Sequence, residues 1–303
     1  MQIRRIKTIS EYHRLRTLPK PQHPLISLID FESMQYSAEN KHTSWVLDFY
    51  SIALKKNFDA KVKYGQQEYD FDDGVLFFIS PNQVYSIEVD KNQLSKPSGW
   101  MLLIHPDFFW KTTLAKNIRK YNYFDYSVNE ALFLSEKEEA TLNIIIQNIQ
   151  NEYDSNIDQF SQSIIISQIE TLLNYADRFY QRQFITRKIS NHQILDRLEK
   201  LLEDYFSNDV LFSKGLPTVH YLADSLHVSQ SYLTGLLKVL TGQSTQQHIH
   251  SKLIEKAKEK LSTTTLSVGE IAYELGFEHS QSFSKLFKTK TNLSPREFRQ
   301  SFN

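Results

Sequence analysis

The 303-residue sequence contains no cysteine, which excludes disulfide bonds and metal sites built on thiolates. Its longest apolar runs, NIIIQNI and SIIIS, are far shorter than the roughly 20 residues that span a bilayer. The basic start, MQIRRIKTIS, is not followed by the apolar segment of a signal peptide. We therefore expect a protein of the reducing cytoplasm that has no membrane partner.

Net charge is also absent, because 35 basic residues balance 35 acidic ones. The distribution is uneven: residues 214–303 carry 11 Lys and Arg against 7 Asp and Glu, a net charge of +4. The remaining 24 basic and 28 acidic residues leave −4 on residues 1–213. A basic end suits a polyanionic partner, but an excess this small also arises by chance, so it only supports stronger evidence.

Residues 24–105 contain short runs rich in β-branched and aromatic residues, separated by Asn, Asp, Gly and Pro. The runs are PLISLIDF, SWVLDFYSIAL, AKVKYGQQEYDF, GVLFFIS, VYSIEV and GWMLLIH. They predict an antiparallel all-β domain, a small barrel or jelly roll. Six of its aromatic side chains either fill the core or line an apolar pocket, and both alternatives stay open: Trp45, Phe49, Tyr64, Tyr69, Phe77 and Tyr85.

Histidine is missing from the predicted strands YGQQEYDF, GVLFFIS and VYSIEV. His23, His42 and His105 lie near strand ends or in loops, without the spacing of metal ligands. The one His-x-His pair, His248 and His250, falls in a predicted helix, where residues two apart face away from each other. We therefore expect no catalytic residue, no metal site and no cofactor.

Residues 106–185 are predicted to be helical, first as a short helix and a loop. Ser135 and Glu138 form a capping box before a longer helix. Two apolar stripes at helical spacing predict an antiparallel pair of helices. The first stripe is Leu142, Ile145, Ile146, Ile149 and Tyr153, and the second is Ile165, Ile169, Leu172, Leu173, Ala176, Phe179 and Tyr180. The polar stretch QRQFITRKISNHQ is the predicted linker, which gives domains over 1–188 and 194–303.

The segment from Ser267 to Phe298 predicts a helix, a tight turn and a second helix. The inner face of the first helix is Val268, Ile271, Ala272 and Leu275. Gly276 follows, where a residue without Cβ takes a left-handed turn conformation. The second helix opens in HSQS, whose serines are the predicted N-caps, and its inner face is Phe283, Leu286 and Phe287.

The outer face of that second helix carries no carboxylate: it presents Gln281, Ser284, Lys285 and Lys288. Amide and hydroxyl groups suit base edges in a DNA major groove, and ammonium groups suit phosphates. Any helical hairpin in a water-soluble protein has a polar outer face, however, so this pattern alone does not establish DNA binding.

A second copy of the pattern lies about fifty residues upstream, in TVHYLADSLHVSQSYLTGLLKVLTGQS, with one residue fewer in its turn. Its matching positions are Leu222, Ala223, Leu226, Val228, Leu233, Leu236, Leu237 and Lys238. Between the copies, Ile249, Leu253, Ala257 and Leu261 recur every four residues in a predicted connecting helix, whose lysines face solvent or reach phosphate. Such a pair places two reading helices in successive major grooves, roughly 34 Å apart.

The stretch GFEHSQSFSKLFKTKTNLSPREFR resembles the signature of the AraC/XylS family of bacterial transcription regulators. The family signature has a Gly-Phe turn, a Ser-x-Phe-Ser/Arg-x-Phe-Lys helix and a closing Ser/Thr-Pro-x-x-aromatic-Arg, and the resemblance covers about the last hundred residues. Asn292 stands where the family usually has Gly, and Asn tolerates the left-handed region. Gly235 stands where the first reading helix often has a basic residue, which makes the first unit the weaker reader.

The resemblance implies an α+β protein of two domains. The N-terminal domain would be a cupin-like barrel over 24–105, where GVLFFISPNQVYSIEV resembles the barrel hairpin, with helices over 106–185. Such barrels often sense a small molecule and such helices commonly carry dimerisation, although both stripes equally serve the domain's own core. The implied partners are double-stranded DNA, a small-molecule effector, RNA polymerase and a second copy of the chain.

The implied DNA-binding units span about 218–241 and 267–291. Their predicted contact residues are Gln230, Ser231, Thr234 and Lys238 in the first unit, and Ser280, Gln281, Ser284, Lys285 and Lys288 in the second. Lys238 and Lys288 are assigned to phosphates and the others mainly to bases. The alternative is a cupin-type binding protein or enzyme whose helical tail is only an interaction module.

Overall fold

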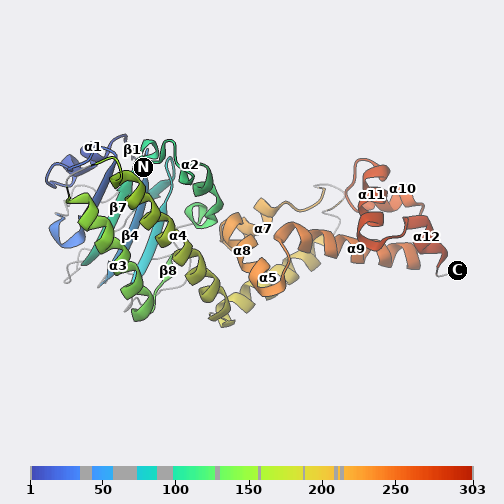
Figure 1. Cartoon of the computed structure of the whole chain (residues 1–303). Helices are drawn as coiled ribbons and strands as arrows, with labels where there is room; N and C mark the ends of the chain where they lie inside the picture. The colour runs from blue at the N-terminus through green and yellow to red at the C-terminus, as the bar shows by residue number, and fades with distance from the viewer. Residues whose placement is uncertain are drawn as a thin grey trace. The chain divides into compact units, whose positions relative to one another are not determined.

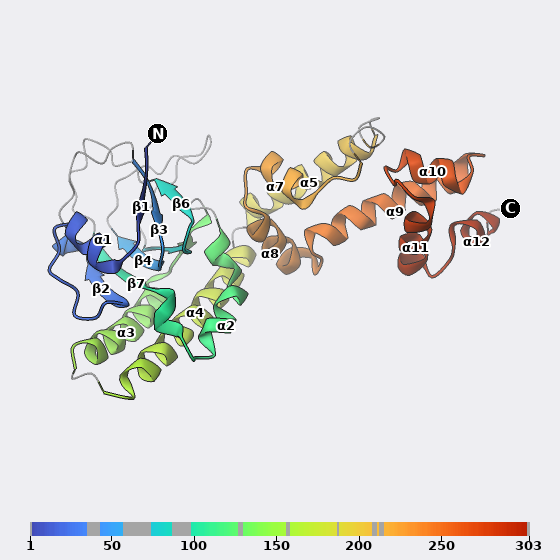
Figure 2. The same ribbon diagram turned by 90° about the horizontal axis from the view of Figure 1, so that it is seen from above.

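The computed structural model describes residues 2–34, 43–56, 74–86, 98–126, 130–155, 158–186, 188–207, 211 and 215–301. The chain divides into two compact units, Met1–Gln183 and Phe184–Asn303. The first unit contains strands and helices, and the described part of the second consists of helices and their connections (Figures 1 and 2). The predicted two-domain α+β organisation is therefore confirmed.

The described strands of the N-terminal unit form two sheets. The smaller sheet has the order β1-β3-β6, with β1 parallel to β3 and β3 antiparallel to β6. The larger has the order β2-β7-β4-β5-β8, with antiparallel pairing throughout. The strands are β1 (Gln2–Ile6), β2 (Ile26–Asp30), β3 (Thr43–Leu47), β4 (Tyr50–Lys56), β5 (Val75–Ile79), β6 (Val84–Ser86), β7 (Ser98–Ile104) and β8 (Leu132–Phe133).

The predicted single run SWVLDFYSIAL forms two strands, one in each sheet. β3 ends at Leu47, and β4 starts at Tyr50 after a corner at Asp48 and Phe49. Phe49 is fully buried, and the amide of Asp48 donates to the carbonyl of Ile6 at 3.0 Å. Corners of this kind pass a chain between two packed sheets. The run AKVKYGQQEYDF lies outside the described residues.

Three of the predicted aromatic positions are buried in the core: Trp45, Phe49 and Tyr85 are at most 7% exposed. They pack with Ile9 and Tyr12 of α1 (Ile9–Leu15), a helix that the sequence did not predict. Phe77 is half-buried, and Tyr64 and Tyr69 lie outside the described residues.

Two long helices lie along one side of the larger sheet (Figures 1 and 2). α3 (Glu136–Tyr153) begins with the predicted capping box of Ser135 and Glu138, and α4 (Ser161–Thr186) follows it. The residues of both predicted stripes are buried except Tyr153, which is half-buried. Short elements precede the pair: η3 (Pro106–Phe109), α2 (Leu114–Asn117), η4 (Ile118–Lys120) and η5 (Asn122–Asp125).

The stretch predicted as a linker is helical in its described residues. α4 continues to Thr186 and α5 (Lys188–Ser207) begins two residues later. Asn191 is buried and its side-chain amide donates to the carbonyl of Phe184 at 2.6 Å. The division between the two units falls between Gln183 and Phe184.

The C-terminal unit continues as seven helices among the described residues: α5, α7 (Val219–Leu226), α8 (Gln230–Thr241), α9 (Thr245–Thr263), α10 (Val268–Glu274), α11 (Ser280–Thr291) and α12 (Pro295–Gln300). One hydrophobic core runs through them, from Leu198 in α5 through Leu253 in α9 to Phe283 in α11. The long middle element of this core is α9, which carries the apolar stripe predicted at a spacing of four residues. All four residues of that stripe are buried: Ile249, Leu253, Ala257 and Leu261.

Candidate nucleic-acid interface

The two predicted hairpins, α7–α8 and α10–α11, have matching interiors. Leu222 and Ala223 in the first, like Ile271 and Ala272 in the second, have no exposed surface. The same holds for the second helices, in the pairs Leu233 with Phe283 and Leu237 with Phe287. The apolar alignment made from the sequence is thereby confirmed at these positions.

The turn between the helices is also built in the same way twice. The amide of Val228 donates to the carbonyl of Ala223 at 3.0 Å, and that of Phe277 donates to Ala272 at 3.0 Å. A residue with positive φ ends each first helix: His227 at 59° and Gly276 at 81°. These are the backbone bonds by which a left-handed residue closes a helix.

The N-caps of the reading helices differ. Ser229 caps α8, because its hydroxyl accepts from the amide of Tyr232 at 3.1 Å. In α11 the N-cap is His279, which makes no side-chain capping bond, and Ser280 is the first helical residue. The predicted serine caps of α11 are therefore wrong. The extra residue in the second turn moves the serines one position into the helix.

The repeat extends beyond the second helix of each hairpin. Gly242 after α8 and Asn292 after α11 both take positive φ, at 75° and 63°. Each is followed two residues later by a serine with a capping box, Ser244 before α9 and Ser294 before α12. The tolerance of Asn in the left-handed position is confirmed, and each unit is a hairpin plus the start of a third helix.

The outer face of α11 is open to solvent. Gln281, Lys285 and Lys288 are exposed, whereas Ser280 and Ser284 are half-buried. Residues three, four and seven positions apart share one face of a helix, so these side chains lie together as predicted. This face combines amide and hydroxyl groups with two ammonium groups.

The outer face of α8 is less accessible. Gln230 and Lys238 are exposed, while Ser231 and Thr234 are half-buried. The hydroxyl of Thr234 shares a hydrogen bond of 3.0 Å with that of Thr245, at the start of α9. Gly235 occupies the position that corresponds to Lys285. The first unit therefore presents fewer free groups than the second.

Three lysines of α9 are held in ion pairs. Lys252 pairs with Glu203 of α5 and, at 3.2 Å, with Glu255. Lys256 lies 3.5 Å from the same Glu203, and Lys260 pairs with Glu274 of α10 at 2.7 Å. The hydrogen bond from Lys252 lowers the pKa of the Glu203 carboxyl.

These contacts tie α9 to α5 and to α10. His248 and His250 on α9 have separate partners, Thr241 at 2.8 Å and Gln246 at 3.0 Å. In the described ranges, no three His, Cys, Asp or Glu side chains gather as metal ligands would.

Arg299 on α12 has a positioning role that the sequence did not predict. Its guanidinium donates to the carbonyl of Leu261 at 3.2 Å and to that of Leu266 at 2.6 Å. These carbonyls lie at the end of α9 and in the connection to α10. Arg299 is the last residue of the C-terminal sequence motif. The motif therefore identifies this residue, but only the folded structure identifies the carbonyls to which it donates.

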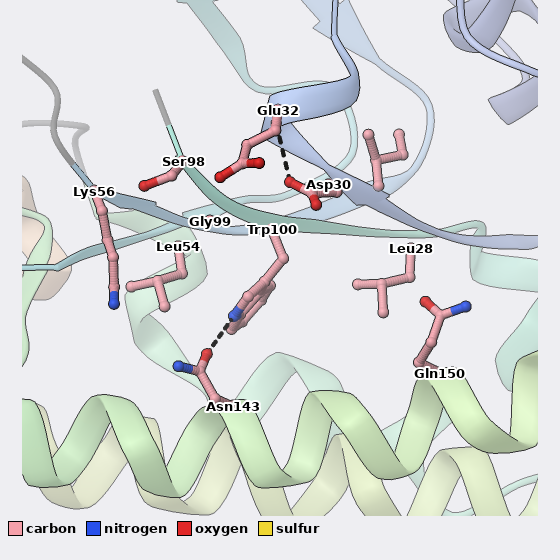
Figure 3. A pocket seen from close by; sticks show the side chains of 11 residues that line it. Leu28, Asp30, Glu32, Leu54, Lys56, Ser98, Gly99, Trp100, Asn143 and Gln150 are labelled. Carbon is pink, nitrogen blue, oxygen red and sulfur yellow. Dashed lines mark hydrogen bonds between the residues drawn. The ribbon is translucent and has the colours of Figure 1, made fainter. Parts of the chain in front are cut away.

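A pocket of about 360 Å³ lies in the N-terminal unit, between α3 and the sheet strands β2, β4 and β7. Leu28, Leu54 and Trp100 form its apolar wall, and Asp30 lies on the strand side of it (Figure 3). The Trp100 indole donates to the side-chain carbonyl of Asn143 on α3 at 2.9 Å. The sequence named no residue of this pocket, because strand and helix meet here only through tertiary packing.

A family model described as a helix-turn-helix domain matches residues 222–301. The chain is 24% identical over 283 residues to YfiF of Bacillus subtilis, an uncharacterized HTH-type transcriptional regulator, which covers 90% of this chain and 85% of YfiF. It is 34% identical over 129 residues to the transcriptional activator RhaS of Escherichia coli, 40% of this chain and 44% of RhaS. The solved C-terminal domain of AraT, a response regulator from Geobacillus stearothermophilus, is 30% identical, with a TM-score of 0.32, over 36% of this chain and 84% of that one.

The C-terminal unit contains a helix-turn-helix domain of the AraC type. The chain is thus a DNA-binding transcription regulator, as the sequence motif predicted. In the part of the chain that the structure describes, no helix has the length and hydrophobicity to cross a bilayer.

Proposed function

We propose that the chain regulates transcription by reading a specific DNA sequence with α8 and α11, one in each of two successive major grooves. The repeated hairpin is the observation that carries this proposal, because both copies share the buried interior and the turn bonds, and each second helix has exposed polar side chains on its outer face. The ion pairs of α9 support it, since they brace the helix that sets the spacing of the two readers.

Within this proposal the second unit is the stronger reader. Gln281, Ser284 and Lys285 contact bases and Lys288 contacts phosphate, with Ser280 at the N-terminal end of the same helix. In the first unit Gln230 and Ser231 contact bases and Lys238 contacts phosphate. Thr234 contributes less there, because its hydroxyl is bonded to Thr245.

Selection of bound sites from random double-stranded DNA by the full-length chain tests the function. Two readers in successive grooves are expected to enrich two blocks of sequence about 10 base pairs apart. A single enriched block would contradict the use of both hairpins, and the absence of any enrichment would contradict sequence-specific binding. A chain with Gln281→Ala and Lys285→Ala together is the control, which should lose the block read by α11.

The N-terminal unit is proposed to be a cupin-like sensor domain that responds to a small molecule. The pocket beside Trp100 supports this role, because it joins an apolar wall to polar groups and has the size of a small-ligand site. A metabolite screen by thermal shift is expected to find a stabilising ligand, and a ligand at 100 times its Kd adds about 2.7 kcal/mol. Leu28→Trp fills the pocket and should abolish that shift. A shift that survives in this variant would exclude the pocket.

A homodimer through α3 and α4, contact with RNA polymerase and a cytoplasmic location complete the proposal. The exposed side chains of Ile144 on α3 and Ile164 on α4 support the dimer, because burying exposed apolar surface against a second copy is favourable. Sedimentation of the chain and of the variant Ile144→Lys tests it. A chain that sediments as a monomer at all concentrations would contradict the dimer.

A further inference from the structure

Three polar side chains form a chain of hydrogen bonds beside the first reading helix. His220 lies on α7, and its Nε2 is 3.2 Å from a carboxylate oxygen of Asp224, one turn later. Its Nδ1 is 3.3 Å from the side-chain nitrogen of Gln230. Gln230 is the first residue of α8, the end of a reading helix that contacts base edges.

The chemistry of the two ends fixes the role of each ring nitrogen. A carboxylate only accepts hydrogen bonds, so Nε2 of His220 carries the hydrogen and donates to Asp224. A neutral imidazole then has a lone pair at Nδ1, which accepts from the amide NH₂ of Gln230. The imidazole thereby selects one of the two orientations of the Gln230 amide.

With one hydrogen of the NH₂ group taken by His220, Gln230 retains one amide hydrogen and its carbonyl oxygen. Adenine presents an N6 donor and an N7 acceptor in the major groove, which match this remaining pair. Guanine presents two acceptors, O6 and N7, and would require both hydrogens of the NH₂ group. The orientation therefore favours adenine over guanine.

We propose that His220 is a positioning residue that orients Gln230 to read an adenine, and that Asp224 holds the imidazole in the required tautomer. This proposal rests on the proposed reading of DNA by α8. It assigns specificity to the unit that has Gly235 in place of a basic residue. Asp224, His220 and Gln230 are exposed to solvent in the free protein. Exclusion of water by the DNA would strengthen the hydrogen bonds among them.

The second unit has no counterpart of this arrangement. By the alignment of Leu222 with Ile271, the position of His220 is held by Gly269 and that of Asp224 by Tyr273. By the alignment of Leu233 with Phe283, Ser280 stands where the first unit has Gln230. The second unit serves as an internal control, because His220 variants should leave its block of the site unchanged.

The test is a selection from random double-stranded DNA with five full-length chains: the native protein, His220→Ala, Gln230→Ala, the double variant of these two, and Asp224→Asn. The native protein is expected to enrich adenine over guanine at one position of the first block. His220→Ala should reduce that preference about 2- to 10-fold, the effect of one neutral hydrogen bond. Asp224→Asn, which keeps an acceptor for the imidazole, should retain most of the preference.

The double variant separates positioning from a structural effect. Once Gln230 is alanine, the further change of His220 should have no effect on base preference, because nothing remains to be oriented. An unchanged preference in His220→Ala, or an equal loss in both backgrounds, would overturn the proposal. Failure of the native protein to enrich any sequence would instead contradict the proposed function. Thermal melting of each variant shows that the domain remains folded.

Discussion

At the scale of the residue, the two kinds of DNA contact assigned to α11 predict different losses. Gln281→Ala should weaken binding to the specific site by roughly 1–3 kcal/mol and leave binding to random DNA unchanged, because it removes a base contact. Lys288→Ala should weaken both and reduce the slope of log affinity against log salt by about one. Salt titrations on specific and random duplexes measure both effects.

The matched control for Lys288 is Lys252, a lysine whose ammonium is held between Glu203 and Glu255. Lys252→Gln should leave the salt slope unchanged, since its charge is already neutralised within the protein. An equal loss for Gln281→Ala on specific and random DNA would refute the base assignment. A slope unchanged by Lys288→Ala would refute the phosphate contact.

At the scale of the element, the corner of the second hairpin depends on Gly276. Its φ is 81°, and an added Cβ would lie 3.0 Å from Cα of Gly215 and 3.1 Å from the carbonyl oxygen of Leu211. Gly276→Ala should therefore combine backbone strain with a clash against backbone, and lower the free energy of unfolding by roughly 1–3 kcal/mol.

Gly242→Ala is the control for that change. Gly242 also has positive φ, at 75°, but an added Cβ would meet nothing within 4 Å. It should show the strain alone, so the difference between the two variants in urea unfolding measures the clash. Equal losses would show that the close approach of the backbone at Gly215 does not matter.

The sequence predicted the hairpins because their signal is local. The apolar spacing of Ile271, Ala272 and Leu275 and the glycine that follows need no knowledge of the rest of the fold. The ion pair of Lys252 could not be predicted from the sequence, because Glu203 lies on another helix about fifty residues away. The carbonyl partners of Arg299 were equally hidden.

Local rules also failed where two of them competed. The serines after His279 are good N-caps, yet one extra residue in the turn places them inside the helix, and His279 is the N-cap. In the N-terminal unit, the apolar run that contains Trp45 and Phe49 does not reveal the corner within it, because apolar residues stand on both sides of the change of sheet. The pocket beside Trp100 depends on packing between strand and helix, for which the sequence has no periodic signal.

At the scale of the whole molecule, histidines in the N-terminal unit and in the C-terminal unit make stability depend on pH. His13 is buried in the N-terminal unit, where its ring nitrogens contact the carbonyl of Pro19 at 2.5 Å and the hydroxyl of Ser27 at 2.9 Å. Burial lowers the pKa of His13, and desolvation also lowers the pKa of His248 in the C-terminal unit. The folded protein therefore keeps both rings neutral at pH values where the unfolded chain is already protonated.

The sign of the effect follows from proton binding. The unfolded chain, with a histidine pKa of about 6.5, binds more protons than the folded one, so stability rises with pH. The contribution is complete above about pH 6.5 and is lost as pH falls from there through the lower folded-state pKa. The capping carboxylates Glu270 and Glu297 have lowered pKa values as well, and their contribution is lost in a separate window below about pH 4.5.

Urea unfolding at pH 8, 6.5 and 5.5 is therefore expected to show a midpoint that falls as the pH is lowered, above the pH window of Glu270 and Glu297. His13→Gln removes one of the groups responsible and should flatten the fall for the transition of the N-terminal unit. The exposed His279, changed to Gln, is the control and should leave the slope unchanged. A midpoint independent of pH in the native chain would show that the folded and unfolded chains bind the same number of protons over this range, which contradicts the lowered pKa of His13. Equal slopes for His13→Gln and the native chain would assign the pH dependence to other groups.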